Sequence, residues 1–334
     1  MINICFVCYY ELKQALLEAA KSLEKLNYKI YDFPMHKYIH DHYDKIDNYD
    51  KLFIDFIFEN KIDVILWWFI KINTDKFEYI HNVTKTKYIF FNWDEPCNWE
   101  DCDIKNKAKF FDCAFITCKE TLQKYIEHGC KDVYCLLPGF SPDVNYPLID
   151  FEYDKYVKYG CDISFCFTNL YENPNFNTQY IQRKKLLDDI YNNQKIRNYT
   201  LHIYCPEHIG INYPESYKGT IDYYDLNYLF NYSKINLCTH VINADGYINE
   251  RTILIGGSGG LILVDNVKGI EEYFDTQNEI IILEKDRYID QIVEILNNYD
   301  NMRTIKNNFH EKCIKKYTYD SWAKNIDDKY LKKI

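Results

Sequence analysis

Along most of its 334 residues the chain alternates short apolar runs with longer amphipathic segments, and this alternation limits the possible folds more than any other feature. Short apolar runs bounded by turn residues are typical of strands buried on both faces. Apolar residues at spacings of three and four are typical of helices. A regular succession of the two predicts βαβ units, in which helices cover parallel strands. The sequence therefore predicts the α/β class, with doubly wound parallel sheets.

The first half of the chain shows the pattern most clearly. We expect strands at residues 2–8, 28–33, 63–68, 88–92, 113–117 and 133–137, with helices at 12–26, 49–60 and 120–127. In the last helix Leu122, Tyr125 and Ile126 recur at helical spacing, and Gly129 follows as a stop signal. These elements predict one open α/β domain, for which we expect the range 1–150.

The pattern lapses between residues 137 and 160, where three of the eight prolines fall within ten residues. Proline fixes φ and lacks the backbone donor that a sheet requires, so this stretch is the best linker candidate. Strands are then expected at residues 162–167, 201–204, 235–238, 261–264 and 279–283, with helices at 179–193 and 287–299. We expect a second doubly wound domain at 151–310 and a C-terminal amphipathic helix within 311–334.

The charge balance and the cysteines narrow the classes of function. The chain has 40 Lys and Arg against 50 Asp and Glu, which argues against a broad basic surface for nucleic acid or an anionic membrane. It has no run of about 18 apolar residues and no signal-peptide pattern. The 13 cysteines lie mostly in apolar, strand-like runs, which favours reduced thiols over a disulfide framework. We expect a soluble protein of the cytoplasm.

The most glycine-rich segment, residues 249–265, reads NERTILIGGSGGLILVD. A phosphate-binding loop runs from a strand through glycines into a helix, but here a helix-like stretch comes first and a strand follows. A tight turn from helix to strand is therefore favoured over a phosphate-binding loop. The better anion site is the helix start, where Tyr247, Asn249, Arg251 and Thr252 lie, because free amides there adjoin a guanidinium.

Four further residues each allow a structural interpretation beside a functional one. Arg183 belongs to a basic run that opens a helix, and it either binds a diphosphate or lies on a solvated surface. His240 directly follows a strand, where side chains commonly face a ligand, although a hydrogen-bonded loop histidine is as probable on pattern alone. His36 and His40 have metal-ligand spacing, but no clear further ligands accompany them, so a solvated loop is favoured.

Asp94 and Glu95 follow the expected strand at 88–92. Adjacent carboxylates on an extended segment point to opposite sides, which disfavours joint chelation of a metal ion. Asp94 is a candidate general base or acceptor-binding residue, because the carboxyl ends of parallel strands commonly bind ligands. A carboxylate that caps the following loop is an equally open reading.

The segment 233–296, which contains the glycine-rich stretch, resembles the C-terminal domain of glycosyltransferases related to the spore maturation protein CgeB. That family has an Arg-x-Phe-Glu helix, an Ala-Cys-Gly-Gly turn, a strand that ends in Asp, a Phe-centred turn and a Glu-initiated strand. The residues of this chain at those places are Arg251, Ser258-Gly259-Gly260, Asp265, Phe274 and Glu279. The segments YIFFNWDEP, KFFDCAFIT and CLLPGFSPDVNYP extend the resemblance into the first half.

The resemblance implies a GT-B fold, with two Rossmann-like domains and a last helix that crosses back to the first domain. It implies that the second domain binds a nucleotide-sugar, possibly a UDP-sugar, that the first binds a glycan or protein acceptor, and that no metal is required. The expected donor-binding residues are Arg183, His240, Tyr247, Asn249, Arg251, Thr252, Gly259 and Gly260. Asp94 is the expected catalytic residue.

Two positions depart from the family pattern. The family's helical Glu falls on Leu254, and Cys166 replaces a glycine after the strand at 162–167. In related retaining transferases the Glu binds the donor ribose. From the resemblance, the main hypothesis is a metal-independent, hexosyltransferase-like glycosyltransferase. The alternative is a degenerate module that binds a nucleotide or glycan without turnover.

Overall fold

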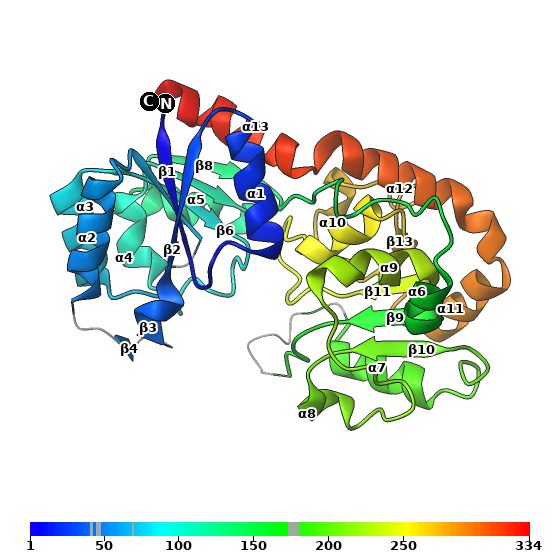
Figure 1. Cartoon of the computed structure of the whole chain (residues 1–334). Coiled ribbons are helices and arrows are strands. Elements are labelled where there is room, and N and C mark those ends of the chain that lie inside the picture. The colour runs from blue at the N-terminus through cyan, green and yellow to red at the C-terminus, as the bar shows by residue number, and fades with distance from the viewer. Residues whose placement is uncertain (41–42, 45–47, 69, 173–178, 180) are drawn as a thin grey trace. The chain divides into compact units, whose positions relative to one another are not determined.

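The computed structural model describes residues 1–40, 43–44, 48–68, 70–172, 179 and 181–334. The chain forms two compact units (Figure 1). The first unit contains Met1–Pro138 together with Tyr319–Ile334, and the second contains Gly139–Thr318. Each unit has its own parallel sheet and its own hydrophobic core.

The first unit is built on a six-stranded parallel sheet with the order β2-β1-β5-β6-β7-β8. Its strands are β1 (Asn3–Cys8), β2 (Lys29–Pro34), β5 (Val64–Trp67), β6 (Lys87–Asn92), β7 (Cys113–Ile116) and β8 (Asp132–Cys135). Its helices are α1 (Gln14–Glu24), α2 (Tyr49–Glu59), α3 (Thr74–Thr84), α4 (Ile104–Lys107), α5 (Lys119–Glu127) and α13 (Tyr319–Lys329). A short antiparallel pair, β3 (Ile39–His40) and β4 (Tyr43–Asp44), adjoins the sheet strands in sequence.

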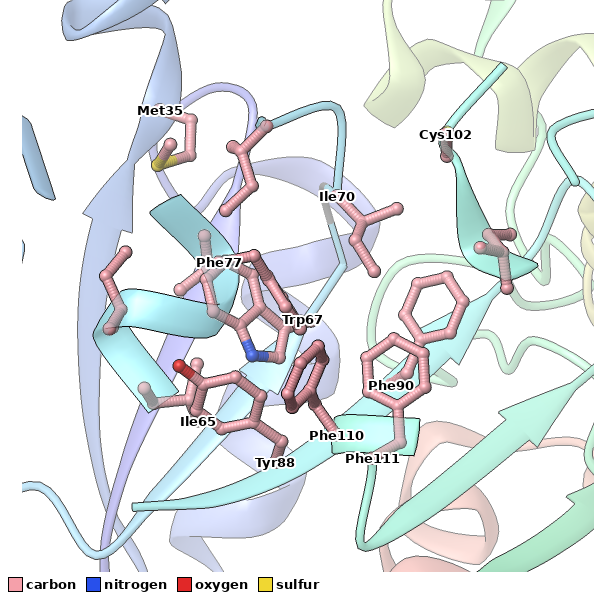
Figure 2. Close-up of a cluster of buried hydrophobic side chains, with 14 of the residues drawn as sticks. Met35, Ile65, Trp67, Ile70, Phe77, Tyr88, Phe90, Cys102, Phe110 and Phe111 are labelled. Atoms are coloured by element: carbon pink, nitrogen blue, oxygen red, sulfur yellow. The ribbon is translucent and has the colours of Figure 1, made fainter. Parts of the chain in front are cut away.

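Alternate residues of these strands form an aromatic core on one face of the sheet (Figure 2). Trp67 of β5 packs on Phe77 of α3 and on Tyr88 of β6, with ring centroids 4.8 and 5.3 Å apart. Because side chains alternate along a strand, the neighbouring Leu66 belongs to the opposite face. Trp67 and Leu66 are both fully buried, so helices cover the sheet on both sides, as the apolar runs predicted.

The second unit has a five-stranded parallel sheet with the order β10-β9-β11-β12-β13. Its strands are β9 (Cys161–Cys166), β10 (Leu201–Tyr204), β11 (Ser233–Cys238), β12 (Ile262–Val264) and β13 (Ile281–Ile282). Its helices are α6 (Tyr153–Tyr159), α7 (Arg183–Asn192), α8 (Glu207–Gly210), α9 (Leu226–Tyr232), α10 (Glu250–Gly257), α11 (Tyr288–Asn297) and α12 (Arg303–Lys316). The predicted α/β class with two doubly wound sheets is confirmed.

All strands expected from the sequence are present, and their ends differ from the expected ones by at most two residues. Helix α3 was not expected. Its local signal is Asn73, whose side chain accepts hydrogen bonds from the amides of Asp75 and Lys76 as an N-cap. Within the described residues, no helix has the length and apolarity needed to cross a membrane. None of the thirteen cysteines, all of which lie in the described residues, forms a disulfide bond.

The division between the units differs from the expected boundary near residue 150. The segment after Pro138 is hydrogen-bonded to the second unit, because the amides of Tyr146 and Leu148 donate to Asn227 and Asn231 of α9. The proline-rich stretch is therefore part of the second unit's surface, not a free linker.

The C-terminal region expected at 311–334 also divides differently. Helix α12 ends the second unit, whereas α13 packs on α1 of the first unit. Ser22 Oγ donates to Asp320 at 2.7 Å, and Tyr28 OH donates to Asp327 at 2.6 Å. The chain returns to the first unit after Thr318, where α13 makes these contacts.

Candidate functional site

The strongest candidate for a ligand-binding residue is Arg183, a buried guanidinium that has no carboxylate partner among the described residues. Only 2% of the residue is exposed. Within the described chain it donates to Oγ1 and the carbonyl oxygen of Thr239, at 2.8 and 2.9 Å, and to the carbonyl oxygen of Asn169 at 2.5 Å. All three acceptors are neutral. Burying a charge is costly unless an opposite charge accompanies it, so this position suits an anionic ligand.

The guanidinium of Arg183 is also held between aromatic rings. Its central carbon lies 5.5 Å from the ring centroid of Phe167 and 4.9 Å from that of Tyr171. Burial and, to a smaller extent, the charge of Arg251 lower the pKa of Arg183 to about 10. The side chain therefore stays charged at neutral pH, and it is fixed in place before any ligand binds.

Arg251 supplies a second cation at the same edge of the sheet. It lies in the first turn of α10, beside the thiols of Cys166 and Cys238, and donates to Cys166. These cysteines are the last residues of β9 and β11. The two arginines are thus placed at the carboxyl ends of neighbouring parallel strands, where open α/β folds bind ligands. No ion pair with a carboxylate is found for Arg251 among the described residues.

The start of α10 is organised by Asn249. Its Oδ1 accepts from the amide and the hydroxyl of Thr252, both at 3.1 Å, and its Nδ2 donates to the carbonyl of Thr239 at 3.0 Å. Asn249 is therefore the N-cap of α10, and Thr252, which is fully buried, supports the cap. Thr239 links this cap to Arg183, because its carbonyl oxygen accepts from both. We infer a positioning role for Asn249 and Thr252.

His240 follows β11 and forms a buried pair with Asp265, which follows β12. Its Nδ1 lies 2.6 Å from Asp265 Oδ1, and its backbone amide donates to the same carboxylate at 3.0 Å. Because a carboxylate accepts hydrogen bonds, Asp265 holds the proton on Nδ1. Nε2 is buried without a partner among the described residues. Tyr247 is buried next to this ring, with a centroid distance of 6.0 Å.

Gly259 and Gly260 do not join this site. They lie at the carboxyl end of α10, where the amide of Gly260 donates to the carbonyl of Ile255 and closes the turn into β12. Gly259 has a φ of +72°, and a Cβ on Gly260 would lie 2.8 Å from Asn236 Nδ2. These contacts require glycines for the backbone turn. The tight turn from helix to strand that the sequence favoured is thus found in the structure, while donor binding by these two glycines stays a prediction.

The two positions that depart from the family pattern are both buried. Leu254 is 3% exposed and Cys166 is 5% exposed. Leu254 lies within α10, whose last turn packs against the second unit's own elements. Burial raises the pKa of the Cys166 thiol, which favours the neutral form beside Arg251. Neither position supplies a carboxylate to the two arginines.

In the first unit, Asp94 and Glu95 differ in burial, although they lie in a bend and a turn and not in the extended segment that the sequence predicted. Asp94 is exposed, whereas Glu95 is completely buried. The carboxylate of Asp94 makes no hydrogen bond to another described residue; the local cap comes from Asn92 Oδ1, which accepts from the amide of Asp94 at 3.2 Å. The protein atoms around Asp94 raise the pKa of its carboxyl although its tip reaches solvent, and Lys71 opposes this shift.

Glu95 is a buried acid that the sequence patterns did not single out. It accepts hydrogen bonds from Asn92 Nδ2 and from the hydroxyl of Tyr125. Burial raises the pKa of its carboxyl to about 7. Asn92 is a local partner, but Tyr125 of α5 lies 30 residues from Glu95, so no local pattern could have revealed the whole network.

The described residues contain no group of three His, Cys, Asp or Glu side chains that could hold a metal ion. Of the histidines near residue 40, His36 places Nδ1 2.9 Å from the carbonyl oxygen of Tyr9 and Nε2 3.4 Å from Glu11. The side chain of His40 lies outside the described part of the structure. These contacts account for His36 as a loop histidine.

The chain matches a known protein family in part of its sequence and several solved structures in its fold. Residues 182–328 match the model of a family described as "Glycosyl transferase-like". Among solved structures, Anabaena HepE in complex with UDP and glucose has a TM-score of 0.70 at 10% identity, with 100% of both chains covered. Sucrose-phosphate synthase from Thermosynechococcus elongatus has a TM-score of 0.72 at 9% identity, with 99% of both chains covered.

A glycosyltransferase from Rickettsia africae is similar as well, with a TM-score of 0.68, 12% identity and 99% and 98% of the two chains covered. No curated protein matches the chain in sequence. At these identities the likeness establishes the fold, which is GT-B.

Proposed function

We infer that the protein is a glycosyltransferase that takes a sugar from a nucleoside diphosphate donor, with a UDP-sugar as the first candidate. The observation that carries this proposal is the pair of arginines in the second unit, of which Arg183 is buried among neutral acceptors only. A diphosphate supplies the missing negative charge. The family match over the same unit and the UDP in the HepE structure support the choice of ligand.

The arginines would serve the reaction as well as binding. Negative charge grows on the diphosphate as the sugar leaves, and guanidinium groups that are already in position stabilise it without reorganisation. His240 would add a further polar contact through Nε2, since Asp265 fixes the orientation of its ring. Two arginines can fulfil the role that a divalent cation has in other transferases, so we propose that the enzyme needs no metal.

For the first unit we propose acceptor binding, with Asp94 as the general base. Its exposed carboxylate follows β6, and its raised pKa favours proton uptake from a hydroxyl. The order of motifs along the chain supports a place near the CgeB-related glycosyltransferases, and cysteines without disulfide bonds support the proposed location in the cytoplasm. The acceptor proposed from this likeness is a glycan or a protein.

The test is calorimetric titration of UDP and UDP-glucose into the wild type and Arg251→Ala. We expect the variant to lose about 1.5–3 kcal/mol of UDP binding, the range for a hydrogen bond to a charged group. Arg287→Ala is the matched control, because Arg287 lies on the same unit but is paired with Glu284 and Glu294. Equal UDP affinity of a folded Arg251→Ala protein would refute the diphosphate site.

A second candidate function is a GT-B module that binds a nucleotide-sugar without turnover. Leu254 favours it, because a buried leucine stands where the resemblance expects the ribose-binding carboxylate. Release of UDP from UDP-glucose, followed with and without EDTA, separates the two. Binding without any release supports the module, and release that requires manganese contradicts the proposed metal independence.

A further inference from the structure

The second unit carries an unusual exposed apolar segment at residues 146–157. Ile149 is 97% exposed, Phe151 65%, Tyr153 69% and Val157 62%. Scattered apolar residues are ordinary on protein surfaces, but a run of large side chains at this exposure marks a place of interaction. We call it the aromatic segment.

This segment is held firmly in place. The amide of Leu148 donates to Asn231 Oδ1 at 2.9 Å, and the amide of Glu152 donates to the hydroxyl of Tyr232 at 2.8 Å. The ring of Phe151 lies 5.9 Å from that of Tyr232. Both partners belong to α9, which holds the backbone of the segment and the ring of Phe151 in place before any ligand arrives. Binding then costs little ordering of side chains.

A cavity of about 490 Å³ opens beside the aromatic segment. Its walls combine aromatic rings with amides and with charges of both signs, including Phe151, Tyr232, Asp150, Asn307, Arg303 and Lys306. Lys306 donates to the hydroxyl of Tyr299, another lining residue, at 3.0 Å. The volume is within the range of small-molecule sites.

We propose that this cavity, together with the aromatic segment, is a binding site for an oligosaccharide. A sugar ring presents apolar C–H faces, which pack on aromatic rings, and hydroxyl groups at its edge, which need donors and acceptors. The cavity wall offers aromatic rings as well as hydrogen-bond donors and acceptors. Asp150 and Asp300 offset Arg303 and Lys306, so the site does not favour a polyanion, and the many polar groups do not suit an acyl chain.

The site is separate from the two arginines. Gly259, at the carboxyl end of α10, lines the cavity, whereas Arg251 lies in the first turn of the same helix. The ligand can therefore bind while a nucleotide occupies the arginines. The assignment of a glycan, as the growing acceptor or product held away from the reacting end, rests on the proposed function.

The experiment is calorimetric titration of maltohexaose, cellohexaose and chitohexaose into the full chain, with and without saturating UDP. We expect at least one probe to bind with equal affinity in both conditions. Phe151→Ala and Arg303→Ala should each weaken that binding about tenfold, which equals about 1.4 kcal/mol. Phe58→Ala is the matched control, because Phe58 is 56% exposed on the first unit.

Other outcomes overturn the proposal. They are the absence of binding by all three probes, binding that both variants retain, and competition between the probe and UDP-glucose. If Phe151→Ala instead abolishes binding to phosphatidylserine vesicles, or converts a dimer to a monomer in sedimentation, the surface serves a membrane or a second copy. UDP affinity measured on the same samples reports separately on the proposed function.

Discussion

At the scale of single residues, each unit contains polar groups that are buried in unusual surroundings. Arg183 has a charge without a carboxylate, His240 has a ring nitrogen without a described partner, and Glu95 is a fully buried acid. Each is stabilised by neighbours that come from other parts of the chain. The shifted pKa values of Arg183 and Glu95 are therefore a property of the folded protein.

Glu95 makes folding depend on pH. Its pKa is about 7 in the folded protein, against an ordinary value of 4.5, so the folded state binds more protons than the unfolded state between these values. Stability must then fall as pH rises from about 4.5 through 7, by an amount on the order of a few kcal/mol. Urea unfolding at pH 5, 6, 7 and 8 should show this decline in the wild type.

Glu95→Gln should flatten the decline, because the amide oxygen can still accept from Tyr125 but the side chain no longer ionises. Glu100→Gln is the control, since Glu100 is an exposed acid of the same region. Parallel pH profiles of wild type and Glu95→Gln would show that Glu95 is not the titrating group.

At the scale of elements, α10 has two ends with different tasks. Its start holds Arg251 through the Asn249 cap, and its end turns at Gly259 and Gly260 into β12. The helix has only eight residues. Measuring UDP affinity and stability for substitutions at its two ends and in its middle separates effects on binding from effects on packing.

Leu254→Glu places a carboxylate in the buried middle of this helix. We expect it to lower stability by several kcal/mol, the cost of an unpaired buried charge, without any gain in UDP affinity. Leu254→Met keeps the volume and should cost less than about 1.5 kcal/mol. Melting temperature and UDP affinity measured together decide the matter; tighter UDP binding by Leu254→Glu would instead place residue 254 at the donor ribose.

Gly260→Ala tests the other end. The added methyl group would lie 2.8 Å from both Asn236 Nδ2 and the carbonyl oxygen of Phe230. We expect a loss of about 1–3 kcal/mol in stability from overpacking, with UDP affinity unchanged. Differential scanning calorimetry and titration provide the two values. A stable variant with weakened UDP binding would return Gly260 to the donor site.

At the scale of the whole molecule, the last helix belongs to the unit that begins the chain. Trp322 of α13 is 2% exposed, and its ring lies 5.7 Å from Trp68 and 5.3 Å from Phe91. Trp322→Ala should cost about 3–5 kcal/mol. Hydrogen exchange should rise in β1, β5 and β6, while β9 and β11 stay protected. Increased exchange confined to β9 and β11 would contradict this division of the chain.

The sequence by itself determined the α/β class, the order of the strands along the chain and the turn at Gly259, because these depend on local patterns of apolar residues and on backbone requirements. It also placed Arg183, His240 and Arg251 at strand or helix ends. Only the tertiary structure decided which of these ends meet. Thr239 joins Arg183 to the α10 cap, and Asp265 orients His240, across parallel strands whose pairing no short segment encodes.

Contacts between distant parts of the chain also explain why the proline-rich stretch and Glu95 differ from the expectations. The proline-rich stretch resembled a linker locally, but α9 supplies side-chain acceptors for its amides. Glu95 resembled an ordinary carboxylate, but Asn92 and Tyr125 enclose it. Burial and hydrogen-bond partners come from residues distant in sequence, and they set both the domain boundary and the pKa values. These properties belong to the folded chain alone.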